Sequence, residues 1–183
     1  MNGGIDSWNG LVSRAEVDQG IYLIEGDETP EEVISLAYGL EEGAYRFYRD
    51  LAERARDEEN KDLFEKLSQA EIQHREYLWE RYKALIGDPV TREAFESGMV
   101  AKTMEGGKTA DQVLALYPDW IHRRGEALQL AMSLETDALD LYLRMAQKGQ
   151  NEDVKAVFYD LADEEKAHLR RLGELVRAKL SLG

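Results

Sequence analysis

Residues 64–78 read FEKLSQAEIQHREYL, and residues 158–172 read FYDLADEEKAHLRRL. In both stretches Phe, Leu, Glu, His and Leu recur at the same five positions, spaced alternately three and four residues apart. This spacing puts the five side chains on one face of a helix. Each stretch therefore predicts a helix whose apolar face carries a Glu-x-x-His pair where an ordinary bundle would have leucine. The pairs are Glu71 with His74 and Glu165 with His168.

The two stretches belong to a longer internal repeat. With an offset of 94 residues, residues 36–80 match residues 130–174 at 15 of 45 positions without a gap. Such self-similarity indicates the duplication of a helical hairpin, which predicts a pseudo-symmetric bundle with any site on its axis. The repeated pairs include Leu40/Leu134, Glu41/Glu135, Ala44/Ala138, Tyr48/Tyr142, Phe64/Phe158, Glu71/Glu165 and His74/His168.

Apolar periodicity predicts four long helices, over residues 30–56, 59–86, 119–148 and 152–180. The first start is marked by Thr29 as a cap, Pro30 at the first helical position and Glu32 closing a capping box. Asn151 caps the fourth helix. Apart from a possible fragment near Tyr22, no period-two pattern of a β-strand is present.

The connector between the second and third helices, residues 87–118, is long enough to cross a bundle, and Thr109 to Gln112 predicts a capping box that opens a short helix within it. Two hairpins joined by a long crossover are the ferritin-like form of a four-helix bundle. We therefore expect an all-α, ferritin-like bundle over residues 29–183, preceded by a tail or linker over residues 1–28.

Composition excludes several kinds of function. The 183 residues include no cysteine, which excludes disulfides, thiolate metal sites and cysteine catalysis. Acidic residues outnumber basic ones by 37 to 23, giving a net charge of -14, so binding to nucleic acid or to an anionic membrane is not expected. No apolar run could span a bilayer, and no signal peptide is apparent, so we expect a cytoplasmic protein.

Two further glutamates adjoin the apolar stripes of the first and third helices. Glu41 precedes Glu71 by 30 residues, and Glu135 precedes Glu165 by the same interval. Four carboxylates inside an apolar bundle would have to be protonated, paired with basic groups or neutralised by metal. The stripes contain no Lys or Arg, only His74 and His168. Four carboxylates and two imidazoles suit two divalent cations, as in di-iron and di-manganese carboxylate sites, and zinc would also serve.

Simpler structural roles for these residues compete with the metal-site interpretation. A single Glu-x-x-His pair usually lies on a solvated face, and a single core histidine is more often structural, but a pair repeated with its upstream glutamate favours metal. Tyr48 and Tyr142, two turns after Glu41 and Glu135, either hydrogen-bond to the ligands or simply fill the core. Other nearby acids fall off the stripes and are expected to be solvated, and His122 is expected near the surface. Those acids are Glu42, Glu76, Asp163 and Glu164.

At these residues the chain resembles the rubrerythrin-like branch of the ferritin-like superfamily, over residues 30–180. The resemblance implies a di-iron centre in which Glu71 and Glu165 bridge the ions while Glu41 and Glu135 are terminal ligands, and it implies reduction of hydrogen peroxide or oxidation of ferrous iron. Two departures stand out. Rubrerythrins have another glutamate where this chain has Ala138, and they carry a cysteine-bound rubredoxin domain that is absent here, so peroxide reduction would need an external electron donor.

A second resemblance concerns the tail. Residues 3–10, GGIDSWNG, are similar to the closing segment of a rhodanese domain, although without cysteine the chain could not transfer sulfur. The tail is then a remnant or a piece of a longer product, and the alternative is an ordinary N-terminus. Apolar tail residues also indicate a homodimer contact. They are Trp8, Leu11, Ile21 and Tyr22.

Three functions remain open from the sequence. The first is a redox enzyme that reacts with peroxide or dioxygen, and the second is binding and oxidation of ferrous iron for storage or transfer. The third is a non-catalytic, metal-stabilised interaction module. The repeated ligand pattern favours the first.

Overall fold

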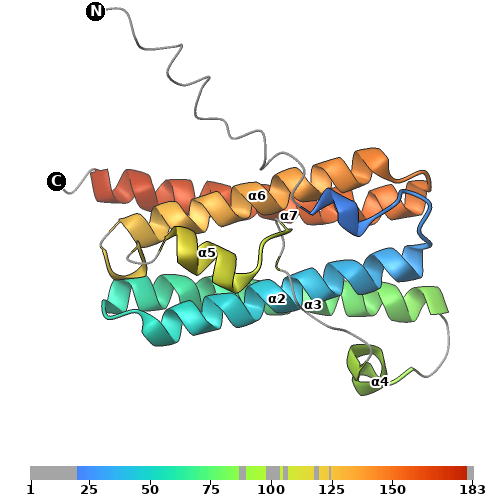
Figure 1. The fold of residues 1–183 in the computed structure, drawn as a ribbon, viewed down its shortest axis with the longest axis horizontal. Coiled ribbons are helices and arrows are strands. Elements are labelled where there is room, and N and C mark those ends of the chain that lie inside the picture. The colour runs from blue at the N-terminus through green and yellow to red at the C-terminus, as the bar shows by residue number, and fades with distance from the viewer. Residues whose placement is uncertain are drawn as a thin grey trace, which may run out of the picture.

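Four long helices build the structure, a computed structural model that describes residues 20–86, 90–97, 104, 107–117, 120–123 and 125–180 (Figure 1). They are α2 (Pro30–Arg54), α3 (Glu58–Ile86), α6 (Glu126–Lys148) and α7 (Glu152–Leu180). Shorter elements are the 3₁₀ turns η1 (Ile21–Leu23) and η3 (Trp120–His122) and the helices α4 (Arg92–Ser97) and α5 (Ala110–Leu116). The described residues include no strand, and none of their helices has the length and apolar character needed to cross a membrane.

The helices are arranged as two antiparallel hairpins, α2 with α3 and α6 with α7 (Figure 1). Helices α3 and α6 run in the same direction, so the chain between them must return along the whole bundle. That return carries α5, which lies over the side formed by α2 and α6. The predicted all-α ferritin-like topology is thereby confirmed.

Capping explains two of the helix starts. The Thr29 hydroxyl accepts a hydrogen bond from the Glu32 backbone N–H at 3.3 Å, while the Glu32 carboxylate accepts from the Thr29 N–H at 2.9 Å. The same reciprocal pair starts α5, between Thr109 and Gln112, at 3.2 and 2.8 Å. Both capping boxes satisfy backbone donors that the first helical turn would otherwise leave unpaired.

The apolar core is divided into two clusters along the bundle. In α3, Phe64 and Leu67 belong to one cluster and Leu78 to the other; in α7, Phe158 belongs to the second and Leu172 to the first. The repeated Glu-x-x-His pairs lie between these positions on both helices. The duplication therefore places a layer of polar side chains midway along the bundle, closed off by apolar residues at both ends.

The structure differs from the sequence-based expectations in several places. The third long helix begins at Glu126 rather than near residue 119, because the chain first forms η3 and then turns at Gly125, whose φ is 90°. The segment at Tyr22 is the turn η1 rather than a strand fragment, and α4 was not predicted. The apolar spacing of the second and fourth helices extends to Leu85 and Leu175, but both side chains are exposed near the helix ends.

The described part of the predicted tail is attached to the bundle. Ile24 is buried, and the Gly26 carbonyl accepts a hydrogen bond of 2.9 Å from the Gln150 N–H. Gly26 has a φ of 111°, and a Cβ atom there would lie 2.8 Å from the Lys148 carbonyl oxygen, so only glycine fits. The segment that resembles rhodanese, residues 3–10, lies outside the described residues.

The repeat-related phenylalanines should each contribute strongly to stability. Phe64 and Phe158 are both fully buried. Phe64→Ala or Phe158→Ala should each lower the free energy of unfolding by about 3–5 kcal/mol, because a large cavity forms in a packed core. Urea denaturation measures the loss. The exposed neighbour Tyr159 is the matched control, and Tyr159→Ala should change stability by less than about 0.5 kcal/mol.

Candidate metal centre

Six polar side chains meet in the layer between the two apolar clusters. Glu41 comes from α2, Glu71 and His74 from α3, Glu135 from α6, and Glu165 and His168 from α7. The four glutamates are 0% exposed, and the two histidines are 4–5% exposed. The structure thus brings all six residues singled out in the sequence into one buried cluster.

Each histidine connects its own helix to the other helix of the same hairpin. His74 Nδ1 lies 2.8 Å from Glu41 Oε2 and 3.2 Å from Glu71 Oε2. In the second half, His168 Nδ1 lies 2.8 Å from Glu135 Oε2 and 3.4 Å from Glu165 Oε2. The two imidazole rings stack on each other, with centroids 4.9 Å apart and planes 12° apart. The Nδ1 atom of each ring therefore faces the carboxylates.

The tyrosines connect the two halves crosswise. The Tyr48 hydroxyl on α2 donates to Glu135 Oε1 on α6 at 2.5 Å, and the Tyr142 hydroxyl on α6 donates to Glu41 Oε1 on α2. Each of these outer glutamates has one oxygen at an imidazole and the other at a phenol. Both carboxylates are consequently held in a fixed orientation, and the hydrogen-bonding role considered for Tyr48 and Tyr142 is the one observed.

The inner glutamates have a different environment. Neither oxygen of Glu71 or of Glu165 has a hydrogen-bond partner of acceptable geometry among the described residues. Burial, reinforced by the neighbouring carboxylates, raises the pKa of both groups well above the usual value. Two buried, unsatisfied carboxyl groups at the middle of a protein are costly.

The outer glutamates titrate in the opposite direction. Burial opposes ionisation of Glu41 and Glu135, but the adjacent imidazoles and the tyrosine hydroxyls outweigh it and lower the pKa of both. Burial likewise disfavours the charged form of His74, yet Glu41 and Glu71 raise its pKa well above the usual value. In the absence of metal, protons held by the inner glutamates and His74 limit the charge of the cluster.

These donors fit a pair of divalent cations. Three ligand triads have all their donor atoms within 4.8 Å of one another. Glu71 and each histidine belong to two of the triads, and Glu165 occurs in the triad with both histidines, so both inner glutamates lie near donor atoms from the two halves. Bound cations would supply the missing partners of their oxygens. The triads are Glu41-Glu71-His74, Glu71-Glu135-His168 and His74-Glu165-His168.

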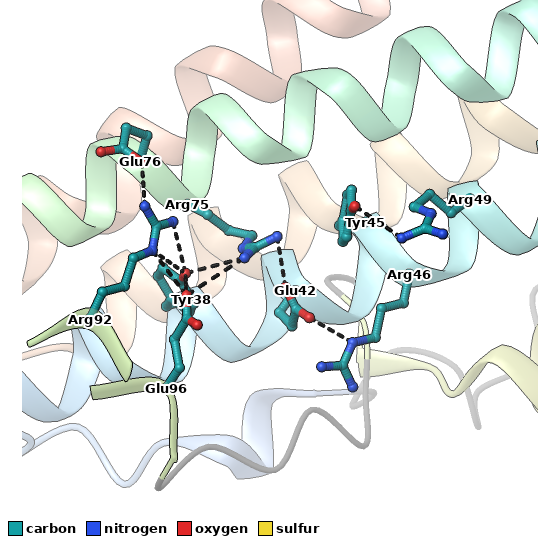
Figure 2. Close-up of polar contacts among 9 residues, drawn as sticks. All are labelled: Tyr38, Glu42, Tyr45, Arg46, Arg49, Arg75, Glu76, Arg92 and Glu96. Atoms are coloured by element: carbon teal, nitrogen blue, oxygen red, sulfur yellow. Dashed lines mark hydrogen bonds and ion pairs between the residues drawn. The ribbon is translucent and has the colours of Figure 1, made fainter. Parts of the chain in front are cut away.

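A network of charged residues lies beside the first half of the cluster (Figure 2). Arg75, which follows His74, forms an ion pair of 2.7 Å with Glu42, a residue that the sequence had placed in solvent but that is only 15% exposed. The Tyr38 hydroxyl donates to Glu96 on α4 and accepts from Arg92 Nη2 at 3.0 Å. This network fastens α4 to α2 and α3.

Sequence reasoning missed this network. A signal was available in the repeat, because the equivalents of Tyr38, Glu42 and Arg75 are Met132, Thr136 and Leu169. The replacement of two charged residues and a tyrosine by Thr136, Leu169 and Met132 marks a place where the duplicated halves have diverged. Three of the acids that were expected in solvent are exposed, namely Glu76, Asp163 and Glu164. His122 lies in η3, outside the cluster.

Comparison with known proteins identifies relatives. The family model described as Rubrerythrin matches residues 13–124 and 125–181. A ferritin-like-encapsulin shell fusion protein of Pyrococcus furiosus is 42% identical over 57 residues, a match that covers 31% of this chain but only 16% of that protein. A solved structure of a hypothetical protein, also from Pyrococcus furiosus, has a TM-score of 0.53 at 21% identity and covers 91% of this chain and 96% of its own; this likeness shows the fold alone.

Glu71→Gln should separate the metal role of this residue from its structural role. With its raised pKa, Glu71 keeps a proton in the folded state that the unfolded chain releases above about pH 4.5, so it reduces the stability of the metal-free protein as pH rises. The amide removes this cost. We expect the metal-free variant to be as stable as wild type or up to about 3 kcal/mol more stable at pH 8, and to lose most of the stabilisation by added metal.

The measurement is thermal unfolding with and without ferrous or manganous ion. Ser68→Ala, a change on the same helix outside the cluster, should keep the full metal-dependent increase in melting temperature. A metal-free Glu71→Gln protein that is much less stable than wild type would contradict this account.

Metal binding should also release protons. Glu71, Glu165 and His74 all have a raised pKa and must lose their protons before they can act as ligands. Affinity for divalent cations should therefore increase as pH rises from about 6 to 8, by roughly tenfold for each proton released per pH unit. Calorimetric titration in buffers of different ionisation enthalpy counts these protons. A binding constant independent of pH would contradict the prediction.

Proposed function

We propose, on the premise that the chain belongs to the rubrerythrin family, that the six-residue cluster holds two iron ions which react with hydrogen peroxide or dioxygen. The observation that carries this proposal is the pair of buried inner glutamates. Among the described residues their oxygens have no hydrogen-bond partner of acceptable geometry, and each lies near donor atoms from both halves of the cluster. A purely structural core would not retain such groups, whereas bound cations satisfy them.

The residues divide naturally between two ions. Glu41 with His74 would hold one ion, and Glu135 with His168 the other, while Glu71 and Glu165 would supply carboxylate oxygens to the pair. Bound iron supplies Lewis acidity and two electrons from its ferrous forms. The glutamates supply negative charge that offsets the two cations, and the apolar clusters on both sides exclude bulk water from the centre.

Tyr48 and Tyr142 have a second role in the proposed reaction with peroxide. Reduction of one hydrogen peroxide to two waters consumes two electrons and two protons, so proton-bearing groups must reach the centre. The hydroxyls of Tyr48 and Tyr142 touch its outer carboxylates and are themselves buried. They hold a proton at each Oη, next to Glu135 and Glu41, and keep these carboxylates aligned.

Repeated turnover needs electrons from elsewhere. The chain contains no cysteine and hence no rubredoxin-type iron site of its own. A separate electron donor must therefore re-reduce the centre, and we propose such a donor as the partner of this protein.

Oxidation of ferrous iron for storage or transfer is the second candidate. It is favoured by the net charge of -14, which concentrates cations near the protein, and by the likeness to a relative whose ferritin-like part is joined to an encapsulin shell. Under this alternative, oxidised iron leaves the centre and new ferrous ions replace it.

Stoichiometry decides between the candidates. Protein loaded anaerobically should bind two ferrous ions per chain, and one hydrogen peroxide should oxidise both within seconds in a stopped-flow spectrometer. The double variant Glu71→Ala/Glu165→Ala should bind and oxidise neither, whereas the surface variant Glu53→Gln should behave as wild type. Oxidation of many irons per chain would favour iron handling instead. If bound metal raises the melting temperature but reacts with neither hydrogen peroxide nor dioxygen, the centre has only a structural role.

A further inference from the structure

A solvent-accessible cavity on one side of the bundle reaches the edge of the metal centre without exposing its carboxylates. A cavity of about 440 Å³ lies between α3 and α7, and every residue that lines it comes from these two helices. The rings of His74 and His168 form part of its lining, although each ring is more than nine-tenths buried. The cavity therefore ends at two residues of the cluster, and we call it the α3/α7 groove.

The opposite side is closed. Between α2 and α6, the space next to Tyr48 amounts to about 10 Å³, which is at the lower limit for a single water molecule. Met104 from the crossover lines that space and is 4% exposed, and α5 runs over the same side of the bundle (Figure 1). The crossover thus covers the tyrosine side of the centre and leaves the histidine side open.

Charge distinguishes the α3/α7 groove further. Asp160, Asp163 and Glu164 on α7 line it, and besides the two histidines its lining contains one basic side chain, Arg171. Asp160 accepts a hydrogen bond from Tyr77 across the groove, and Asp163 is paired with Lys166 at 2.8 Å. The positions on α3 that correspond to Asp163 and Glu164 in the repeat are Gln69 and Ala70, so the acidic rim is a property of the second half alone.

We propose that the α3/α7 groove is the entrance through which divalent cations reach the centre, drawn in by its acidic rim and passing the imidazole edges of His74 and His168. The proposal rests on the proposed metal-binding function. Stacked rings with centroids 4.9 Å apart leave no gap for a hydrated ion. A cation must therefore shed water and pass as a ring rotates, which makes the histidines both ligands and the inner barrier.

A charge test uses cobaltous ion as probe, because its visible absorption reports binding independently of catalysis. Asp163→Asn/Glu164→Gln should slow cobalt uptake by about three- to tenfold at low salt, and the difference from wild type should shrink at high salt. The matched control is Asp50→Asn/Glu53→Gln on α2, which removes the same charge from two residues outside the groove, paired there with Arg54 and Arg49. It should leave the uptake rate within twofold of wild type. All three proteins should bind two ions at equilibrium.

A steric test is independent of charge. Ala70 lines the groove, whereas its neighbour Gln69 is exposed and does not. Ala70→Trp should slow cobalt uptake at least fivefold while Gln69→Trp should not, with circular dichroism and the melting temperature verifying that both fold. Equal uptake rates in the groove variants and their controls would contradict the proposal that the groove is the entrance. If these proteins still bound two ions, the proposed function would stand. Failure of the wild-type protein to bind cobalt or iron would instead overturn the proposed function itself.

Discussion

The cost of burying four carboxyl groups governs this structure. Each ionised carboxylate withdrawn from water costs several kcal/mol unless a counter-charge or hydrogen bonds replace its hydration. The bundle meets this demand in two ways. Glu41 and Glu135 each have an imidazole and a phenol as hydrogen-bond partners. Glu71 and Glu165 have only longer approaches to the imidazoles, at 3.2 and 3.4 Å, and are left to protons or cations for the rest. The outer pair is therefore arranged in advance, and the inner pair is where bound metal would contribute stability to the fold.

Duplication makes the centre a property of the whole bundle rather than of either hairpin. Tyr48 reaches from the first half to Glu135 in the second, and Tyr142 reaches back to Glu41. Separated hairpins would leave each of these hydrogen bonds unmade and would expose both apolar clusters. Consequently, the two halves dock, the carboxylates reach their final orientation and water is excluded in a single event. This explains why each half retains the complete set of repeat-related residues.

Sequence patterns were sufficient where the local chain determines its own structure. The alternating three- and four-residue spacing located α2, α3 and α7, the capping boxes at Thr29 and Thr109 located two helix starts, and the repeat assembled the six cluster residues. The failures lie in the crossover and the tail segment. There α4, η1 and the delayed start of α6 depend on contacts with distant helices, such as Phe95 against Tyr38 and Gly26 against Gln150, which no short-range pattern encodes.

The same crossover removes the symmetry that duplication would otherwise impose on the centre. On one side it covers the tyrosines; beyond α3 it brings Arg92 and Glu96 to Tyr38 and completes the charged network next to His74 (Figure 2). The second half has Met132, Thr136 and Leu169 at the corresponding positions and carries the acidic groove instead. Two ions held by near-identical donor sets would thus experience different surroundings, one beside a network of ion pairs and the other beside Met132, Thr136 and Leu169. Because the affinity and potential of a metal ion depend on the charges around its ligands as well as on the ligands, the two halves of this centre should not be equivalent.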